Sequence, residues 1–266
     1  MKLTTLHKLS QMKLEKDPIT VLTAYDATYA NLLSKQGIDV ILVGDSLGMV
    51  IQGNRTTVPV TIEQMCYHTE AVVRGNQSAF VIGDMPYMTY ATVDAALDNA
   101  TLLMQSGANM VKLEGGEWLF DTVAKLSDVG IPVCAHLGLT PQSVDALGGY
   151  RVQGRDEEQA SQIIQDAIAL QEAGASMLVL ECVPADLAKK ITDQLSIPTI
   201  GIGAGVHTDG QVLVLYDMLG LNLDFRPKFV KDFVAEKGVE TIADAISLYI
   251  RQVKERSFPT ADHSFE

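Results

Sequence analysis

The stretch GANMVKLEGG (residues 107–116) shows the pattern on which the fold prediction depends: a glycine, a short apolar strand, and an acidic residue near the end of the strand. GIDVILVGDS (37–46) and GASMLVLECV (174–183) repeat this pattern elsewhere in the chain. Near-continuous apolar strands are typical of a parallel sheet that is covered on both faces. Each of the three stretches therefore predicts one buried parallel strand that follows a helix.

Segments with helical spacing alternate with strand-like segments along the rest of the chain. Further strands are predicted at ITVLTAYD (19–26), FVIGDMP (80–86), IPVCAHLG (131–138), IPTIGIGAG (197–205) and, as the eighth, YDMLGL (216–221). Eight strand–helix units in 266 residues favour a closed barrel over an open sheet, since such barrels typically contain roughly 250 residues. The sequence therefore predicts the α/β class and a (β/α)8 TIM barrel.

The two ends of the chain differ from this alternation. Leu6, Leu9 and Met12 recur every three residues, which predicts a short amphipathic helix that closes one end of the core. SFPTADHSFE (257–266) has no helical or strand pattern, and we expect it to be frayed or docked on a neighbouring chain. We predict a single barrel domain over residues 1–256, which includes the N-terminal helix, followed by a C-terminal tail.

Composition excludes several classes of function. Twenty Lys and Arg residues against 33 Asp and Glu give a net charge of −13, which disfavours nucleic acid and anionic membrane surfaces as partners. No apolar run approaches the ~18 residues of a membrane span, and the first residues lack the apolar core of a secretory signal. Cys66, Cys134 and Cys182 are scattered and odd in number, which is typical of reduced thiols in a cytoplasmic protein.

Acidic residues close four of the predicted strands: Asp45, Asp84, Glu114 and Glu181. In a barrel, the C-terminal ends of the strands converge on one mouth, where such folds carry their chemistry. Four carboxylates there would repel one another unless a cation lies among them or some are protonated. Oxygen ligands favour a hard metal ion, Mg²⁺ above all. Alternatively, Asp45 and Asp84 only cap the turns that follow them. For Asp26, which directly precedes a predicted helix, we favour the N-cap role.

Three further polar residues lie close to these acids in the sequence. Lys112 lies two residues before Glu114, so both side chains share one face of the strand. A buried lysine needs an anionic partner, either Glu114 itself or the carboxylate of a substrate. Ser46 follows Asp45 and could donate a hydrogen bond to the same anion. His136 ends the fifth strand, either as a donor to an oxyanion or in a structural hydrogen bond.

Two other features leave more than one interpretation open. Neighbours on a strand alternate in direction, so Cys182 is expected to point away from the mouth if Glu181 points into it. GIGAG (201–205) follows the seventh strand, where many barrels bind phosphate. Because no P-loop lysine, serine or threonine follows these glycines, a tight turn that allows close approach of a bulky ligand is an equal alternative.

A set of motifs in fixed order covers nearly the whole chain. It resembles the ketopantoate hydroxymethyltransferase (3-methyl-2-oxobutanoate hydroxymethyltransferase) family of pantothenate and coenzyme A biosynthesis. Each piece is short, but the ordered set is highly specific. The motifs are VGDSLGMVIQG (43–53), FVIGDMPYMTY (80–90), VKLEGG (111–116), AHLGLTPQ (135–142), GGYRVQGR (148–155), LVLECVP (178–184) and IGIGAG (200–205).

The resemblance implies a Mg²⁺-dependent barrel enzyme. Such an enzyme transfers a hydroxymethyl group from 5,10-methylenetetrahydrofolate to 3-methyl-2-oxobutanoate through a Mg²⁺-stabilised enolate, and the product is 2-dehydropantoate. The family typically assembles as a homodecamer of two stacked pentamers.

The resemblance also implies roles for residues of the site. Asp45 and Asp84 would ligate the metal ion and contact the substrate, and Glu114 would complete the metal shell. Ser46 and Lys112 would hold the α-keto acid. The remaining implied role is general-base catalysis by Glu181. For His136, its position at the end of the fifth strand predicts substrate binding.

Two other functions remain open at the level of sequence. One is a Mg²⁺-dependent enzyme of the isocitrate lyase and phosphoenolpyruvate mutase type, which breaks C–C or P–C bonds. The other is a non-catalytic barrel that senses folate or a keto acid. Exchange of the substrate's proton with solvent distinguishes a sensor from an enzyme, because a sensor has no reason to labilise that proton.

Overall fold

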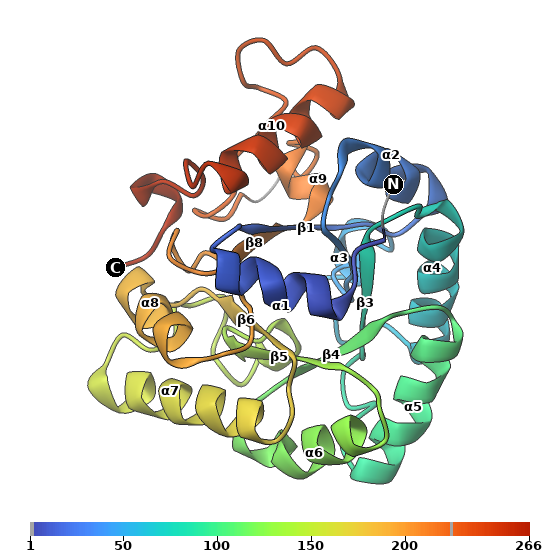
Figure 1. Ribbon diagram of the computed structural model, residues 1–266, viewed down its shortest axis with the longest axis vertical. Helices are drawn as coiled ribbons and strands as arrows, with labels where there is room; N and C mark the ends of the chain where they lie inside the picture. Colours follow the sequence, from blue (N-terminus) through green and yellow to red (C-terminus); the bar gives the residue numbers. More distant parts are fainter. Residues whose placement is uncertain (1–2, 224–225) are drawn as a thin grey trace.

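The computed structural model describes residues 3–223 and 226–266 and confirms the predicted TIM barrel. Eight parallel strands, each paired with the next and β8 with β1, form a closed barrel (Figure 1). The strands are β1 (Ile19–Thr23), β2 (Val40–Val43), β3 (Phe80–Asp84), β4 (Met110–Glu114), β5 (Val133–Gly138), β6 (Met177–Glu181), β7 (Thr199–Ile202) and β8 (Gly210–Leu213).

Helices surround the barrel as an outer layer (Figure 1). Asp26 caps the second helix as predicted, since its carboxylate accepts from the backbone N–H of Tyr29 at 2.9 Å. Within the described part of the chain, no helix combines the length and apolar character that crossing a membrane would require. The α-helices are α1 (Leu6–Glu15), α2 (Ala27–Gln36), α3 (Leu47–Val50), α4 (Ile62–Gly75), α5 (Val93–Gln105), α6 (Phe120–Asp128), α7 (Glu157–Glu172), α8 (Ala185–Gln194), α9 (Leu215–Met218) and α10 (Ile242–Lys254).

The alternation of side chains along each strand divides the core into two parts. On β2, Ile41 and Val43 pack in the layer between barrel and helices, whereas Val40 and Leu42 belong to the cluster inside the barrel. Because neighbours alternate between the two faces, every second residue points inward. On β4 this places Met110 in the interior cluster. Lys112 and Glu114, two and four positions later, point to the same interior.

Helix α1 closes the end of the barrel at which the strands begin. Leu9 and Met12 are fully buried within the interior cluster, and Leu6 packs against it. The Thr5 hydroxyl caps the helix by accepting from the backbone N–H of Lys8. The apolar spacing of the sequence therefore predicted both the helix and the face that it buries.

The predicted eighth strand was wrong: β8 is Gly210–Leu213, and most of the segment 216–221 lies in or directly after the one-turn helix α9. The backbone N–H of Leu215 donates to the Thr23 hydroxyl at 3.0 Å, which ends the pairing with β1 at this point. A Cβ at Gly210 would lie 2.4 Å from the carbonyl oxygen of Ile19, so only glycine allows this close pairing. Because the strand is short and begins at a glycine, it lacks the apolar run from which the other strands were predicted.

The C-terminal tail packs against its own barrel, so the prediction that it is frayed was wrong, and docking on a neighbouring chain stays a prediction. Phe258 is buried, and its ring lies 5.4 Å from that of Phe233. The carbonyl oxygen of Phe265 accepts a hydrogen bond from the backbone N–H of Ala185, at the start of α8, at 2.9 Å. These contacts place the end of the chain beside the mouth of the barrel.

Candidate active site

A cavity of about 860 Å³ opens where the strands end, and its size is in the range of small-molecule sites. Residues from several strands and from the loops that follow them line it. All seven residues singled out from the sequence line this one cavity: Asp45, Ser46, Asp84, Lys112, Glu114, His136 and Glu181.

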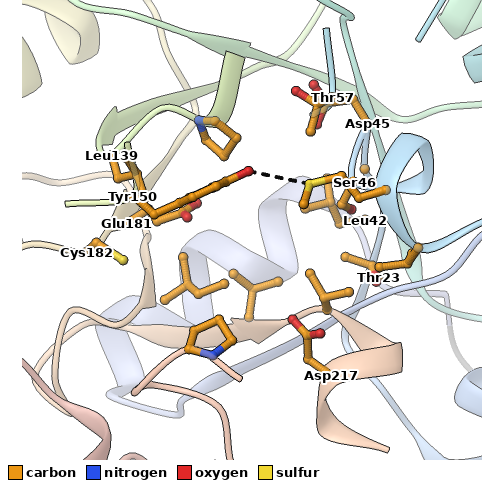
Figure 2. Close-up of a pocket in the computed structure, with 18 of the residues that line it drawn as sticks. Thr23, Leu42, Asp45, Ser46, Thr57, Leu139, Tyr150, Glu181, Cys182 and Asp217 are labelled. Atoms are coloured by element: carbon orange, nitrogen blue, oxygen red, sulfur yellow. Dashed lines mark hydrogen bonds between the residues drawn. The ribbon is translucent and has the colours of Figure 1, made fainter. Parts of the chain in front are cut away.

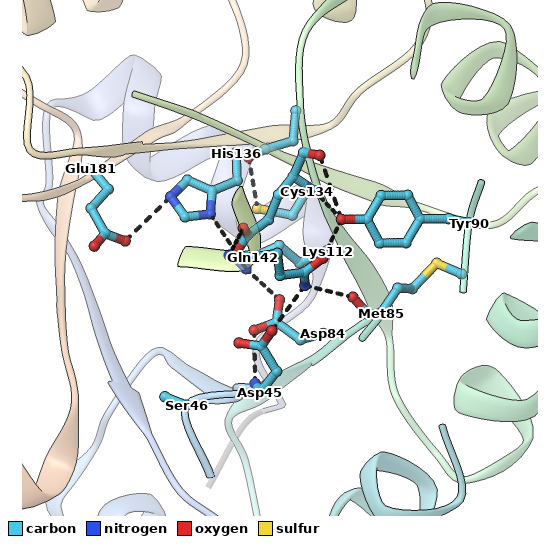
Figure 3. Close-up of polar contacts among 12 residues, drawn as sticks. Asp45, Ser46, Asp84, Met85, Tyr90, Lys112, Cys134, His136, Gln142 and Glu181 are labelled. Atoms are coloured by element: carbon cyan, nitrogen blue, oxygen red, sulfur yellow. Dashed lines mark hydrogen bonds and ion pairs between the residues drawn. The ribbon is translucent and has the colours of Figure 1, made fainter. Parts of the chain in front are cut away.

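Lys112 forms the centre of the polar cluster at the buried part of the cavity (Figure 3). Its ammonium lies 2.5 Å from Asp84 Oδ1 and 3.2 Å from Glu114 Oε1. Burial lowers the pKa of Lys112, but the carboxylates of Asp84 and Glu114 outweigh burial and raise it well above its usual value. The lysine is therefore charged. Its anionic partners are Glu114 on its own strand, β4, and Asp84 at the end of the neighbouring strand, β3.

His136 bridges two further acids. Its Nδ1 lies 3.1 Å from Glu114 Oε1, and its Nε2 lies 3.3 Å from Glu181 Oε2. Burial and the nearby Lys112 disfavour the charged ring, but the charge and hydrogen bond of Glu114, followed by the contact with Glu181, raise the pKa of His136 to about 9. The charged ring of His136 on β5 therefore contacts one acid on β4 and one on β6.

The acids carry more negative charge than these two cations balance. Burial opposes ionisation of Glu114, yet Lys112 and His136 lower its pKa to about 2. Asp45 has no such partner: burial, followed by repulsion from Asp84 and Glu114, raises its pKa to about 8. When all four acids are ionised, the ammonium and the imidazolium leave two negative charges in excess, which a divalent cation would neutralise.

The oxygen ligands of this site fit Mg²⁺ better than they fit a metal ion whose ligands all come from the protein. Among residues 3–223 and 226–266, no three His, Cys, Asp or Glu side chains converge to hold a metal ion alone. Asp45 and Asp84 lie close together, because the backbone N–H of Asp45 donates to Asp84 Oδ2 at 3.1 Å. Mg²⁺ is usually bound by one or two carboxylates, with water and substrate completing its octahedron. Zinc sites are built mainly from Cys and His ligands, whereas Asp45 and Asp84 offer only oxygen atoms.

Ser46 and Thr57 carry hydroxyl groups on the wall of the cavity near Asp45 (Figure 2). The Ser46 hydroxyl is held by that of Tyr25 at 2.9 Å. Thr57 was not predicted. Its hydroxyl is buried and has no hydrogen-bond partner within the described residues. No periodic pattern marks Thr57, because it lies in the irregular segment between α3 and α4.

Cys182 lines the cavity, so the prediction that it points away was wrong (Figure 2). Strand β6 ends at Glu181, and Cys182 adopts a left-handed backbone with φ of 48°. The alternation rule therefore no longer applies at this residue. Burial, together with the charge of Glu181, raises the pKa of the thiol, so Cys182 presents a neutral sulfur to the cavity.

Aromatic side chains of the chain itself approach the glycine turn after β7 closely, and the approach of a ligand to this turn stays a prediction. Gly203 has φ of 62°, and a Cβ there would lie 3.0 Å from the ring of Phe229 and 3.1 Å from that of Phe265. Aromatic rings therefore occupy the space that a phosphate would need at this glycine. The turn helps to form an apolar wall of the cavity.

Gln142 and Tyr90 were also missed from the sequence. The Gln142 side chain donates to Asp45 Oδ2 at 2.9 Å, and its backbone N–H donates to Glu114 Oε2 at 3.0 Å. The Tyr90 hydroxyl donates to Gln142 Oε1. Both residues lie outside the strands, and the only signal for them was their place in the motifs 80–90 and 135–142.

Sequence comparison identifies the family. The model for ketopantoate hydroxymethyltransferase matches residues 3–261. The chain belongs to this family. A 3-methyl-2-oxobutanoate hydroxymethyltransferase of Idiomarina loihiensis is 59% identical over 99% of this chain and 98% of that protein. The enzyme of the same name from Photorhabdus laumondii subsp. laumondii is 58% identical over the full length of both chains. The family is one of transferase enzymes, and the resemblance predicted from the motifs is confirmed.

Solved structures with this fold are more distant. A phosphoenolpyruvate phosphomutase from Streptomyces platensis subsp. rosaceus aligns with a TM-score of 0.61 and 12% identity over 95% of this chain and 99% of that one. A phosphonopyruvate hydrolase in complex with oxalate and Mg²⁺ aligns with a TM-score of 0.62 and 11% identity over 80% and 81% of the two chains. At these identities the likeness establishes a shared fold, whereas the high identity lies with the hydroxymethyltransferases.

Proposed function

We propose that this chain transfers a hydroxymethyl group from 5,10-methylenetetrahydrofolate to 3-methyl-2-oxobutanoate, giving 2-dehydropantoate for pantothenate biosynthesis, and that it requires Mg²⁺. The observation that carries the proposal is the cluster of four acids, three of them buried, with only two cationic side chains at the barrel mouth. The names of its relatives supply the substrate class.

Asp45 and Asp84 would hold the Mg²⁺ ion. When bound, the ion supplies Lewis-acid stabilisation of negative charge on the oxygen atoms of the keto acid. Glu114 has both carboxylate oxygens engaged, Oε1 with Lys112 and His136 and Oε2 with the backbone of Gln142. Within the described residues Glu114 accepts three hydrogen bonds, two of them from cationic side chains, whereas Asp84 accepts two. This difference supports a role for Glu114 at the edge of the metal shell, through a water molecule.

Lys112 and Ser46 would bind the carboxylate of the keto acid. An ammonium has three N–H donors, and Asp84 and Glu114 accept from Lys112 in the described structure. The remaining donor is available to a substrate anion, and the Ser46 hydroxyl, oriented by Tyr25, lines the same cavity. His136 would donate from Nε2 to an oxygen atom that gains negative charge, since its ring is held in the charged form and Nε2 has no hydrogen-bond partner among the described residues.

Glu181 would be the general base. Its side chain is 13% exposed, whereas those of Asp84 and Glu114 are 3% and 2% exposed, so it faces the open part of the cavity. Its contact is with the ring of His136, away from the Asp45–Asp84 pair. A carboxylate in this place can take the proton from C3 of the keto acid, and the resulting enolate forms a C–C bond to the methylene carbon of the folate. Both C–N bonds of that carbon break over the reaction, water supplies the hydroxyl group, and tetrahydrofolate leaves.

The outer part of the cavity would hold the folate. Its lining includes the rings of Tyr150, Tyr216, Phe229 and Phe265, which offer apolar faces to a flat heterocycle. The volume of about 860 Å³ leaves space beyond a five-carbon keto acid.

Two further properties are proposed for the chain as a whole. Leu3 and Leu14 are 66% and 73% exposed at either end of α1, and they could be covered in a homo-oligomer, for which we propose a decamer. Light scattering at micromolar concentration that gives the mass of one chain would contradict the assembly. The three cysteines are free thiols, which supports a cytoplasmic location.

Proton–deuterium exchange into 3-methyl-2-oxobutanoate, with and without Mg²⁺, tests the proposed function. The proposal predicts exchange at C3 that depends on Mg²⁺ and needs no folate. A folate or keto-acid sensor would show binding without exchange. An enzyme that cleaves P–C bonds would instead consume phosphonopyruvate.

A further inference from the structure

Gln142 contacts two of the four acids at once (Figure 3). It lies in a short 3-10 turn, Pro141–Ser143, that follows β5, and it is buried. Its side-chain NH2 group donates to Asp45 Oδ2 and to the carbonyl oxygen of Met85, both at 2.9 Å. Its backbone N–H donates to Glu114 Oε2 at 3.0 Å. A single residue thus links the ends of β2, β3 and β4.

Tyr90 fixes the orientation of the Gln142 amide. The Tyr90 hydroxyl donates to Gln142 Oε1, and the Tyr90 ring is buried and stacked on Trp118 with centroids 5.6 Å apart. If the amide were rotated by half a turn, Oε1 would face the Asp45 carboxylate and the Met85 carbonyl. Two acceptor–acceptor contacts would replace two hydrogen bonds, so only one orientation is favourable.

This arrangement determines which oxygen of Asp45 is free. Gln142 holds Oδ2, and Oδ1 remains for another partner. Asp84 is held in a similar way, since Lys112 donates to its Oδ1 and the backbone of Asp45 donates to its Oδ2. Hydrogen bonds of this kind orient metal-binding side chains before the ion arrives.

We propose that Gln142 is a positioning residue that holds Asp45 with Oδ1 toward the cation and that Tyr90 holds Gln142 in the required orientation. The inference rests on the proposed function, in which Asp45 and Asp84 bind Mg²⁺. A residue with a purely structural role would affect the stability of the fold when changed, but not the affinity for Mg²⁺. Metal affinity therefore separates the two roles.

The test measures Mg²⁺ binding by titration calorimetry in the presence of 3-methyl-2-oxobutanoate. Gln142→Leu keeps similar volume and removes the amide, and we expect the affinity for Mg²⁺ to fall about 10- to 100-fold. Gln211→Leu is the matched control, because Gln211 is also a buried glutamine but donates to Gly205 and Thr208 at 3.0 and 2.9 Å, away from the acids. We expect wild-type affinity in this control.

Tyr90→Phe is the second variant, and it keeps the stacked ring in case Gln142→Leu does not fold. Loss of one hydrogen bond to the amide should weaken Mg²⁺ binding by roughly 2- to 10-fold. In both variants, high Mg²⁺ should restore proton exchange to near the wild-type rate, which a misfolded site would not allow.

The possible outcomes separate the inference from the function on which it rests. Wild-type Mg²⁺ affinity in folded Gln142→Leu, or in Tyr90→Phe where the former does not fold, overturns the inference alone. A wild-type protein that binds the keto acid but no Mg²⁺ overturns the proposed function and the inference together. Equal losses in Gln142→Leu and Gln211→Leu assign Gln142 a structural role and also overturn the inference.

Discussion

Replacement of Lys112 by methionine should destabilise the protein far more than the loss of an ion pair at the surface. The ammonium lies 2.5 Å from Asp84 and 3.2 Å from Glu114, and all three side chains are at most 5% exposed. Lys112→Met leaves Asp84 buried without a cation and leaves Glu114 with His136 as its cationic partner. Removing one partner of a buried ion pair typically costs about 3–5 kcal/mol of unfolding free energy.

A matched control separates the effect of burial on stability from the effect of the distance between the two charges. Lys189 lies at the same 2.5 Å from Asp193, but the two side chains are 49% and 62% exposed. Lys189→Met should therefore leave the unfolding free energy nearly unchanged, as is typical of exposed pairs four residues apart on a helix. Urea unfolding in Mg²⁺-free buffer near pH 8 measures both variants. Equal losses in the two variants would refute the argument that burial determines the importance of Lys112.

Three further predictions concern the same cavity. Without Mg²⁺, the unfolding midpoint should fall as the pH rises from 6.5 to 9, because folding raises the pKa of Asp45 to about 8 and that of His136 to about 9. A group whose pKa is higher in the folded state binds more protons there than in the unfolded chain, so the folded state loses stability as the pH rises toward that pKa. An unfolding midpoint that is constant or rises over this range contradicts the prediction. Asp45→Ala and Asp84→Ala should abolish Mg²⁺ binding in calorimetry and leave the far-ultraviolet circular dichroism spectrum unchanged; wild-type affinity in both variants would exclude them as ligands. Thr57→Val should raise the unfolding free energy by about 1 kcal/mol, because it removes a buried hydroxyl without a partner, and a loss of stability in urea unfolding would show that the hydroxyl is satisfied.

The sequence predicted the parts of the site that follow from strand periodicity. Asp45, Asp84, Glu114 and Glu181 each follow or end a short apolar strand, and a parallel barrel brings such positions to one mouth. Lys112 was predicted on the same grounds, since two residues along a strand return to the same face. Its pairing with Asp84 was not predicted, because it depends on the register Asp84↔Lys112 between β3 and β4.

The features that were missed lie where periodicity ends. Cys182 leaves the strand through a left-handed backbone, and Thr57 lies in an irregular segment. Gln142 reaches Asp45 across 97 residues of sequence, a contact that no local pattern encodes. The short strand at Gly210–Leu213 was hidden for a related reason, since its pairing requires a glycine, which local patterns associate with turns.

Proton exchange in Glu181→Gln tests the central claim most directly. The substitution keeps the size of the side chain but removes the carboxylate that would take the proton, while Asp45 and Asp84 remain. The account predicts near wild-type binding of Mg²⁺ and 3-methyl-2-oxobutanoate and a rate of C3 proton exchange, followed by proton NMR, that is lower by roughly 10²- to 10⁴-fold. Exchange at the wild-type rate would contradict the account, because Glu181 would then be an acid that only holds His136 in place.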